Sequence, residues 1–204
     1  MRDDELKPVL TELQQYEGRE HSLYLDNAEH PNVTVGVGCL VASVDAAQCL
    51  PFHHVTDGLR ATPDEIARDF IRVRLMRGGL PARAYRGNLA LSDADIDALG
   101  FSRLREFLAG LPGVFPGFDG FPLSVRQVLL DLAWNVGLGA EATSTRAATG
   151  LRAWAGLRAA CNSVPPDWKS AAHECTTANP NHSPVREARN AYRANGFLDA
   201  ASAA

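Results

Sequence analysis

Residues 21–41 read HSLYLDNAEHPNVTVGVGCLV, and this stretch decides the fold class. Leu23 and Leu25 alternate with more polar neighbours, turn-forming residues follow, and three valines then alternate from residue 33 to residue 37. A period of two residues is typical of strands, so the stretch predicts a small antiparallel hairpin or three-stranded sheet. Gly36 leaves one face of the second strand without a side chain, as expected where another backbone or a ligand comes close.

The chain on both sides of this stretch follows helical patterns. Apolar side chains recur every three or four positions from Leu6 to Tyr16, which predicts a first helix over residues 4–16 that ends at Glu17-Gly18. Residues 42–61 have no clear period, and we expect them to be irregular. The rest of the chain predicts helices near residues 62–76, 92–108, 124–136, 150–161, 166–175 and 184–195.

Local start and stop signals support these helices. Thr62-Pro63-Asp64-Glu65 is a capping box with proline at the first helical position. Ser92 and Ser124 are expected to cap two later helices, Gly100 to break one and Gly196 to end the last. The predicted class is α+β: a single domain over residues 1–204, with a β lobe at 17–60, a helical lobe at 1–16 and 61–200, and a cleft between them.

Composition excludes several classes of protein. The chain has 204 residues, of which 46% are hydrophobic and 22% charged, so general disorder is excluded. No apolar run approaches the ~18 residues of a transmembrane span. The net charge of −4 argues against nucleic-acid binding, which needs a basic face. The acidic N-terminus has no apolar segment, so no secretory signal is expected.

The four cysteines leave two interpretations open. Their spacing contains no CxxC pair, so a zinc ribbon is not expected, and the adjacent His53 and His54 do not suggest a metal site. Local disulfides, Cys39 with Cys49 and Cys161 with Cys175, would suit an oxidising compartment. Four buried reduced thiols are the alternative.

Glu17, Asp26 and Thr34 are the candidate catalytic residues. Glu17 lies where the first helix ends, and the negative end of the helix dipole disfavours ionisation, which suits a general acid. Asp26 follows nine residues later and Thr34 eight residues after that. An acid, a base and a hydroxyl that positions water are the groups that glycoside hydrolysis requires. The spacing alone fits ordinary surface residues as well.

Three short motifs carry a family resemblance. Tyr16-Glu17-Gly18, Tyr24-Leu25-Asp26 and TVGVGCL at residues 34–40 resemble, in that order, the catalytic signature of the phage-type lysozymes. The resemblance implies that Glu17 protonates the glycosidic oxygen, that Asp26 activates water and that Thr34 holds this water. The interval from Asp26 to Thr34 is about two residues longer than in the best-known members.

The resemblance continues towards the C-terminus. VRQVLLDLAWNVG at residues 125–137 resembles the family's long buried helix, which makes Asn135 a substrate-contacting amide and Trp134 a packing residue. WKSAAHEC and SPVREARN resemble the closing segment, in which an arginine faces the catalytic glutamate. Arg186 falls on that position, with Arg189 as its neighbour. Phe118, in a loop rich in glycine, proline and phenylalanine, is expected either at the cleft rim or in the core.

Two departures from the family stand out. Cys39 stands where the family often has a structural histidine. Phage lysozymes are often strongly basic, whereas this chain has a pI near 5.8. Its electrostatic attraction to an anionic cell wall should therefore be weak, which favours delivery at high local concentration.

The resemblance implies a muramidase that cleaves the β-1,4 bond between N-acetylmuramic acid and N-acetylglucosamine. It implies no metal or organic cofactor, glycan strands of peptidoglycan as the partner, and a monomer. A lytic transglycosylase with one essential glutamate, and a non-catalytic wall-binding module, are the alternatives. The expected setting is synthesis in a bacterial cytoplasm and action on the periplasmic wall, either as a released phage endolysin or as an injected effector with an immunity partner.

Overall fold

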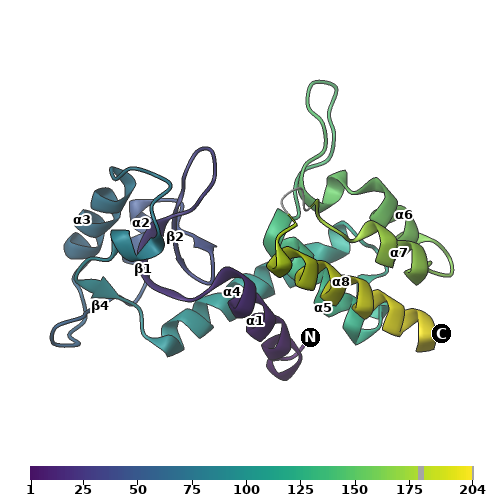
Figure 1. Ribbon diagram of the computed structural model, residues 1–204, viewed down its shortest axis with the longest axis horizontal. Helices are drawn as coiled ribbons and strands as arrows, with labels where there is room; N and C mark the ends of the chain where they lie inside the picture. Colours follow the sequence, from purple (N-terminus) through teal and green to yellow (C-terminus); the bar gives the residue numbers. More distant parts are fainter. Residues whose placement is uncertain (179–181, 204) are drawn as a thin grey trace. The chain divides into compact units, whose positions relative to one another are not determined.

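The computed structural model describes residues 1–178 and 182–203 and confirms the predicted α+β class. The chain divides into two compact units. We call residues 13–103 the sheet unit, and residues 1–12 together with 104–204 the helical unit. Figure 1 shows the elements of both units along the chain. The division places residues 61–103 with the strands, so it does not follow the lobe boundary expected near residue 60.

The sheet unit contains the strands that the alternating stretch predicts. Three strands form an antiparallel sheet in chain order: β1 (Glu20–Leu25), β2 (Val33–Gly36) and β3 (Cys39–Leu40). Tyr24 of β1 lies opposite Thr34 of β2. The region expected to be irregular contains α2 (Val44–Gln48) and β4 (His53–His54), which pairs with β5 (Leu89–Ala90). Helix α3 (Pro63–Arg74) and the 3-10 turn Ala82–Tyr85 complete the unit, together with the adjoining parts of α1 (Asp3–Glu17) and α4 (Asp93–Gly110).

Strand β2 is buried on both faces, which explains the glycine that ends it. All four of its residues are buried, with Val35 at 0% exposure. Gly36 has φ +68°, a left-handed conformation that favours glycine. A Cβ at Gly36 would lie 3.4 Å from Cγ2 of Ile96 in α4. The face that was expected to admit a backbone or ligand is therefore filled by a helix side chain.

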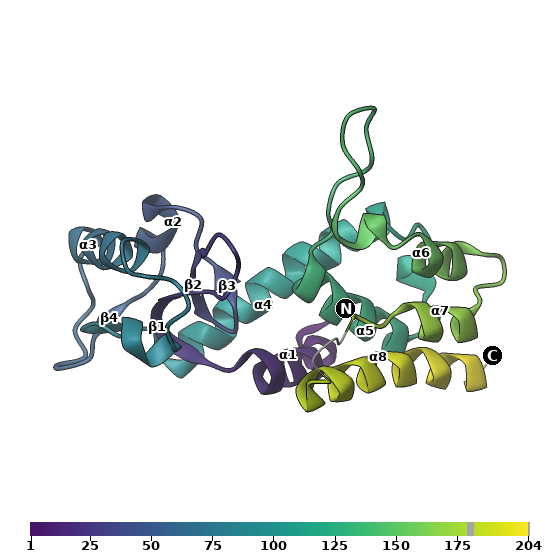
Figure 2. The same ribbon diagram turned by 45° about the horizontal axis from the view of Figure 1, so that its top comes forward.

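The helical unit is built around α8. It contains α5 (Leu123–Val136), α6 (Ala155–Asn162), α7 (Trp168–Glu174) and α8 (Pro184–Ala203), with 3-10 turns at Leu111–Gly113, Phe118–Gly120 and Gly150–Ala153. Figure 2 shows α8 running alongside α5 and α7, with which it packs. Both views show the connection between α5 and α6 projecting as a long loop.

The contact between α5 and α8 corrects two predicted helix signals. Gly196 was expected to end the last helix, but α8 continues to Ala203. A Cβ at Gly196 would collide with Cγ2 of Val128, so this glycine allows close helix packing. Ser124 was expected to cap α5, but Pro122 precedes the helix and the Ser124 hydroxyl donates to the Gly196 carbonyl at 2.8 Å.

An aromatic cluster corrects the expectation of a Phe118 side chain at a cleft rim. The Phe118 side chain is 0% exposed. Its ring packs edge-on against Phe121, which in turn packs against Trp168, and Trp168 stacks on Phe197. Because hydrophobic side chains from distant segments enclose it, the Phe118 ring belongs to the core and cannot contact a substrate.

All four cysteines carry free thiols, so the local disulfides are not formed in this structure. Cys39, Cys161 and Cys175 are buried, as the alternative interpretation expects, but Cys49 is exposed. Burial raises the pKa of Cys161 to about 12, with a smaller contribution from Cys175.

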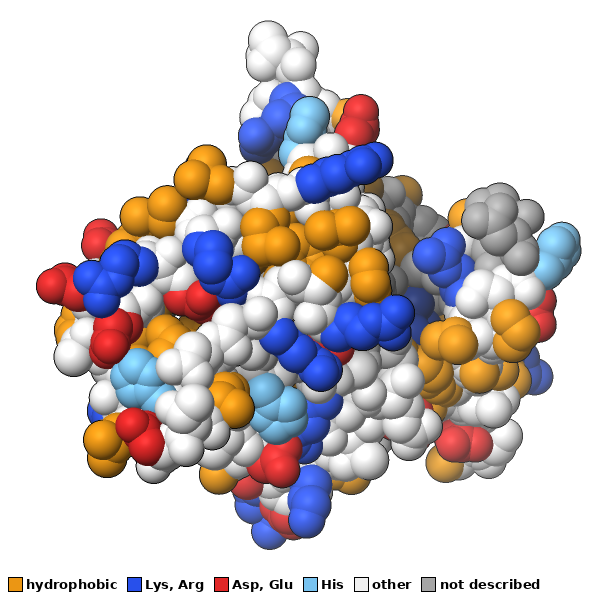
Figure 3. Space-filling model, turned by 60° about the vertical axis from the view of Figure 1, so that its left-hand side comes forward, with side chains coloured by type: hydrophobic (Ala, Val, Ile, Leu, Met, Phe, Trp, Pro, Cys, Tyr) orange, Lys and Arg blue, Asp and Glu red, His pale blue; other side chains and the backbone are white. Residues whose placement is uncertain are grey.

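Within the part of the chain that the structure describes, no helix is both long and apolar enough to cross a membrane. On the face in Figure 3, acidic and basic side chains are interspersed with hydrophobic ones.

Candidate active site

Glu17 is the last residue of α1, as the sequence predicts. Gly18 ends the helix with φ +79°, and its N–H donates to the Gln14 carbonyl at 3.1 Å. Only glycine adopts this conformation without strain, and it fixes where the helix stops. The Glu17 carboxyl group is therefore held at the negative end of the helix dipole.

Asp26 follows directly after β1 and closes the loop that leads to β2. Its Oδ1 accepts hydrogen bonds from the backbone N–H groups of Asn32 at 2.9 Å and Ala28 at 3.2 Å. Its Oδ2 accepts from Nδ2 of Asn32 at 3.2 Å. A carboxylate can accept about four hydrogen bonds, so one position on Oδ2 is still available for a water molecule.

Glu17 and Asp26 line one pocket of about 640 Å³ within the sheet unit. This volume falls in the range of pockets that hold small-molecule ligands. Helix α1, strand β1 and the segment before the 3-10 turn all contribute to its wall. The lining residues are Tyr16, Glu17, Glu20, Tyr24, Leu25, Asp26, Asn27, Gly79, Leu80, Pro81 and Ala82.

Tyr24 and Glu20 are pocket residues that the sequence analysis missed. Burial, reinforced by the nearby Glu17 and Glu20 carboxylates, raises the pKa of Tyr24 to about 12. The phenol therefore stays protonated at neutral pH and can donate a hydrogen bond. Glu20 forms an ion pair with Arg86 at 3.3 Å. Tyr24 and Asp26 share the same parity at the end of the strand, and this signal could have placed them on one face, whereas the register shift between Glu20 and Tyr24 removes it for Glu20.

The hydroxyl of Thr34 hydrogen-bonds to the loop that follows Asp26. Thr34 is 4% exposed and is not one of the residues that line the pocket. Its Oγ1 donates to the Asn32 carbonyl at 3.2 Å, and the same carbonyl accepts from the Asp26 N–H at 3.0 Å. The structure thus brings Glu17 and Asp26 to one pocket, and Thr34 does not line that pocket. Gly36 is likewise absent from the pocket wall.

The other predicted site residues lie in the helical unit. Asn135 is exposed in the last turn of α5, and its Oδ1 accepts from Nη2 of Arg193 at 3.4 Å. Arg186 is exposed, and its Nη1 donates to the Ala178 carbonyl at 2.6 Å. Trp134 packs against Phe107, in agreement with its predicted packing role.

A buried ionic cluster joins α5 to α8, and the sequence analysis did not find it. Asp131 is 0% exposed and pairs with Arg189 at 2.9 Å and Arg193 at 2.5 Å. Burial lowers the pKa of Arg193, while Asp131 opposes this effect. The signal was a lone carboxylate within the most apolar helix, together with two arginines four residues apart on the last helix.

Comparisons with known proteins name no family for this arrangement. No protein-family model matches the chain, and no curated protein matches it. Among the described residues, no group of three or more His, Cys, Asp or Glu side chains could hold a metal ion. The residues of the pocket are therefore the basis for assigning a function.

Proposed function

We propose that the protein is a peptidoglycan hydrolase, a muramidase that cleaves the β-1,4 bond between N-acetylmuramic acid and N-acetylglucosamine. The observation that carries the proposal is that a glutamate at a helix end and an aspartate at a strand end line one pocket. The resemblance of their motifs to the phage-type lysozymes supports the same assignment.

The chemistry assigns one step to each carboxyl group. Glu17 donates its proton to the glycosidic oxygen as the bond from that oxygen to the anomeric carbon breaks. Asp26 accepts a proton from the water that attacks the anomeric carbon. A carboxyl separation of ~6.5–9.5 Å would leave room for that water and give inversion. The Tyr24 phenol, as a neutral donor, can hold a sugar oxygen in the same pocket.

The remaining parts of the proposal follow from the resemblance. Asn135 and Arg186 are proposed as substrate contacts, and peptidoglycan glycan strands as the partner. The protein is proposed to act as a monomer on the periplasmic wall after synthesis in a bacterial cytoplasm. An immunity protein would be a partner if the chain is an injected effector.

A lytic transglycosylase is the second candidate, and two observations favour it. Both oxygens of Asp26 accept hydrogen bonds from its own loop, and Thr34 lies off the pocket wall. In a transglycosylase, Glu17 alone would act first as the acid and then as the base. The C6 hydroxyl of the muramic acid would attack its own anomeric carbon and leave a 1,6-anhydro end without consuming water.

Digestion of purified peptidoglycan tests these candidates. Wild type, Glu17→Gln and the control Glu12→Gln, on the same helix but outside the pocket wall, are compared by mass spectrometry of the soluble products. The muramidase requires products with ordinary reducing ends that are lost with Glu17→Gln and kept with Glu12→Gln. Anhydro products would identify the transglycosylase instead. Folded wild type that binds the wall but releases no product would overturn both candidates and leave a binding module.

A further inference from the structure

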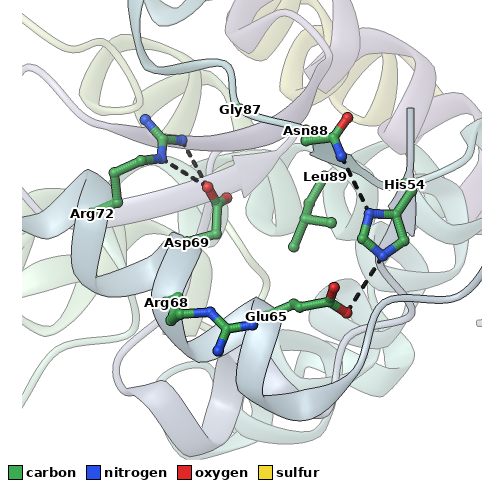
Figure 4. A pocket seen from close by; sticks show the side chains of 8 residues that line it. All are labelled: His54, Glu65, Arg68, Asp69, Arg72, Gly87, Asn88 and Leu89. Carbon is green, nitrogen blue, oxygen red and sulfur yellow. Dashed lines mark hydrogen bonds and ion pairs between the residues drawn. The ribbon is translucent and has the colours of Figure 1, made fainter. Parts of the chain in front are cut away.

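A second pocket of about 370 Å³ lies in the sheet unit, and no described residue lines both pockets. Helix α3 and the β4–β5 pair form its walls, as Figure 4 shows. Leu89 provides an apolar surface within a ring of charged and polar side chains. The lining residues are His54, Glu65, Arg68, Asp69, Arg72, Gly87, Asn88 and Leu89.

The Asp69 carboxylate has one oxygen without a partner. Asp69 is 9% exposed, and its Oδ1 accepts from Nε of Arg72 at 2.8 Å. Nη2 of Arg72 also donates to the Tyr85 carbonyl at 2.6 Å, which holds that guanidinium on the Oδ1 side. Oδ2 is buried and has no hydrogen-bond partner among the residues that the structure describes. Figure 4 shows the second oxygen on the side of the carboxylate that faces Leu89.

A buried carboxylate oxygen without a donor is uncommon in folded proteins and calls for an explanation. Asp69 belongs to the pocket wall, so a donor supplied by a ligand in this pocket would give Oδ2 the partner that it lacks while Oδ1 keeps its bond to Arg72. The missing group must be a donor, because an ionised carboxylate only accepts hydrogen bonds. An ammonium group is such a donor, and its positive charge complements the carboxylate.

The opposite wall is already satisfied by its own partners. Nδ2 of Asn88 lies 3.3 Å from Nδ1 of His54, and Nε2 of His54 lies 3.4 Å from Oε2 of Glu65. Since the amide nitrogen of Asn88 can only donate, Nδ1 of His54 accepts and its Nε2–H faces Glu65. Glu65 also accepts from the Thr62 N–H at the start of α3.

Arg68 completes the charge pattern of the pocket. It precedes Asp69 on α3, is exposed, and has no ion pair or hydrogen bond in the described part of the chain. The wall holds the carboxylates of Glu65 and Asp69 and the guanidinium groups of Arg68 and Arg72, so its formal charge is zero with His54 neutral. A ligand that carries one positive and one negative group keeps that balance.

We propose that this pocket binds the head group of an α-amino acid, with the ammonium group on Asp69 and the carboxylate on Arg68. A planar guanidinium matches a carboxylate through two parallel hydrogen bonds, and Leu89 contacts the carbon atoms between the two charged groups. The head group can come from a free amino acid. It can also come from the distal end of a diaminopimelate residue in a wall peptide, which carries an ammonium and a carboxylate on one carbon.

Three small ligands test the head group on the full chain by NMR titration. Alanine carries both charges, ethylamine lacks the carboxylate and propionate lacks the ammonium group. Saturable shifts at Asp69, Arg68 and Leu89 are expected with alanine, D or L, and at least ten-fold weaker binding with the other two ligands. Equal binding of ethylamine and alanine would overturn the role of Arg68, and no saturable shift with alanine would overturn the proposal.

Matched variants locate the two contacts. Arg68→Gln and Asp69→Asn should each weaken alanine binding about ten-fold or more, because each removes one charged partner. Arg74→Gln, an exposed arginine on the same helix but outside the pocket wall, should bind as wild type. If Asp69→Asn unfolds, Arg68→Gln still decides the outcome, because the Arg68 side chain is exposed. Unchanged affinity in Arg68→Gln would refute the assignment.

A second titration separates the two sources of the head group. A wall tripeptide ending in diaminopimelate is compared with the same peptide ending in lysine, which keeps the side-chain ammonium group but has no carboxylate beside it. Tighter binding of the diaminopimelate peptide than of both the lysine peptide and alanine indicates a wall peptide as the ligand. Equal affinity of the site for the diaminopimelate peptide and for alanine indicates the free amino acid. Glu17→Gln should bind alanine as wild type, so loss of the proposed hydrolase activity and loss of this site can be distinguished.

Discussion

The Asp26 carboxylate stabilises its loop and is the proposed general base, and substitutions can separate these two roles. Asp26→Asn keeps an oxygen for the backbone N–H groups of Asn32 and Ala28 but loses the bond to Nδ2 of Asn32. One exposed hydrogen bond should lower the free energy of unfolding by about 1 kcal/mol. Loss of a general base should lower the rate about 100-fold or more. Urea unfolding and product release measure the two effects.

Asn32→Ala is the matched control for this substitution. It removes the same side-chain hydrogen bond and leaves the carboxylate in place. We expect a similar loss of stability with a change in rate well below that of Asp26→Asn. An Asp26→Asn protein that retains most of the wild-type rate would contradict a base at this position and would favour the transglycosylase.

The pKa of the Tyr24 phenol depends on the charges of its neighbours in the pocket. Burial, with added repulsion from Glu17 and Glu20, raises its pKa to about 12, against about 10 for an unfolded tyrosine. The resulting stability is fully present below about pH 10 and is lost as the pH rises from 10 to 12, because the unfolded chain releases this proton first. Absorbance titration of wild type against Tyr24→Phe should show one late tyrosine. Glu17→Gln should lower the pKa of Tyr24, and an unchanged value would place Glu17 too far away to share its pocket.

Some site residues could be predicted because local sequence determines their position. Gly18 ends the helix at Glu17, and the strand carries Asp26 to its end, so both could be placed from neighbouring residues. Thr34 and Phe118 could not be placed, because their surroundings come from other segments. The alternating pattern predicted the correct strand for Thr34, but only the folded structure shows that its hydroxyl binds the Asn32 carbonyl and that Thr34 does not line the pocket.

At the level of the elements, two capping signals whose residues lie within one helical turn predicted the helix starts correctly. The capping box at Thr62 and Glu65 is present, and the Ser92 hydroxyl accepts from the Asp95 N–H at 3.2 Å. The predictions were wrong for glycines whose role depends on how their helix packs. Gly100 does not break α4, which is continuous over Asp93–Gly110, and Gly196 is a packing contact with Val128. A single sequence does not show what a glycine faces.

Removing the acidic member of the ionic cluster between α5 and α8 should lower stability more than removing a basic member. Asp131→Asn leaves two buried guanidinium groups without a counter-charge, so we expect the free energy of unfolding to fall by about 3–5 kcal/mol. Arg193→Met leaves the balanced pair of Asp131 with Arg189 and should cost clearly less. Asp199→Asn, an exposed carboxylate on the same helix, should stay within about 0.5 kcal/mol of wild type. Thermal and urea unfolding measure these differences. Equal losses of unfolding free energy for Asp131→Asn and Arg193→Met would contradict the idea that uncompensated buried charge causes the loss in Asp131→Asn.

At the scale of the whole molecule, net charge predicts how salt affects the proposed hydrolysis. The chain carries −4 at pH 7, and peptidoglycan walls are anionic, so the two repel each other at long range. The Debye length falls from about 30 Å at 0.01 M to about 8 Å at 0.15 M ionic strength, which screens this repulsion. The initial rate on intact walls should therefore hold or rise over that range, whereas a basic enzyme would lose its attraction to the wall. An uncharged chitin oligosaccharide should show no salt dependence.

A charge variant tests whether repulsion is the cause of that salt dependence. Asp119 and Asp199 are exposed, and lysine at both positions changes the net charge by four units, from −4 to 0. The double variant Asp119→Lys, Asp199→Lys should digest walls faster than wild type at low salt and at the same rate near 0.15 M, because only the unscreened repulsion differs. Equal rates at low salt would show that the approach to the wall does not limit the reaction. A wild-type rate that falls with salt would point instead to a local basic surface that outweighs the net charge.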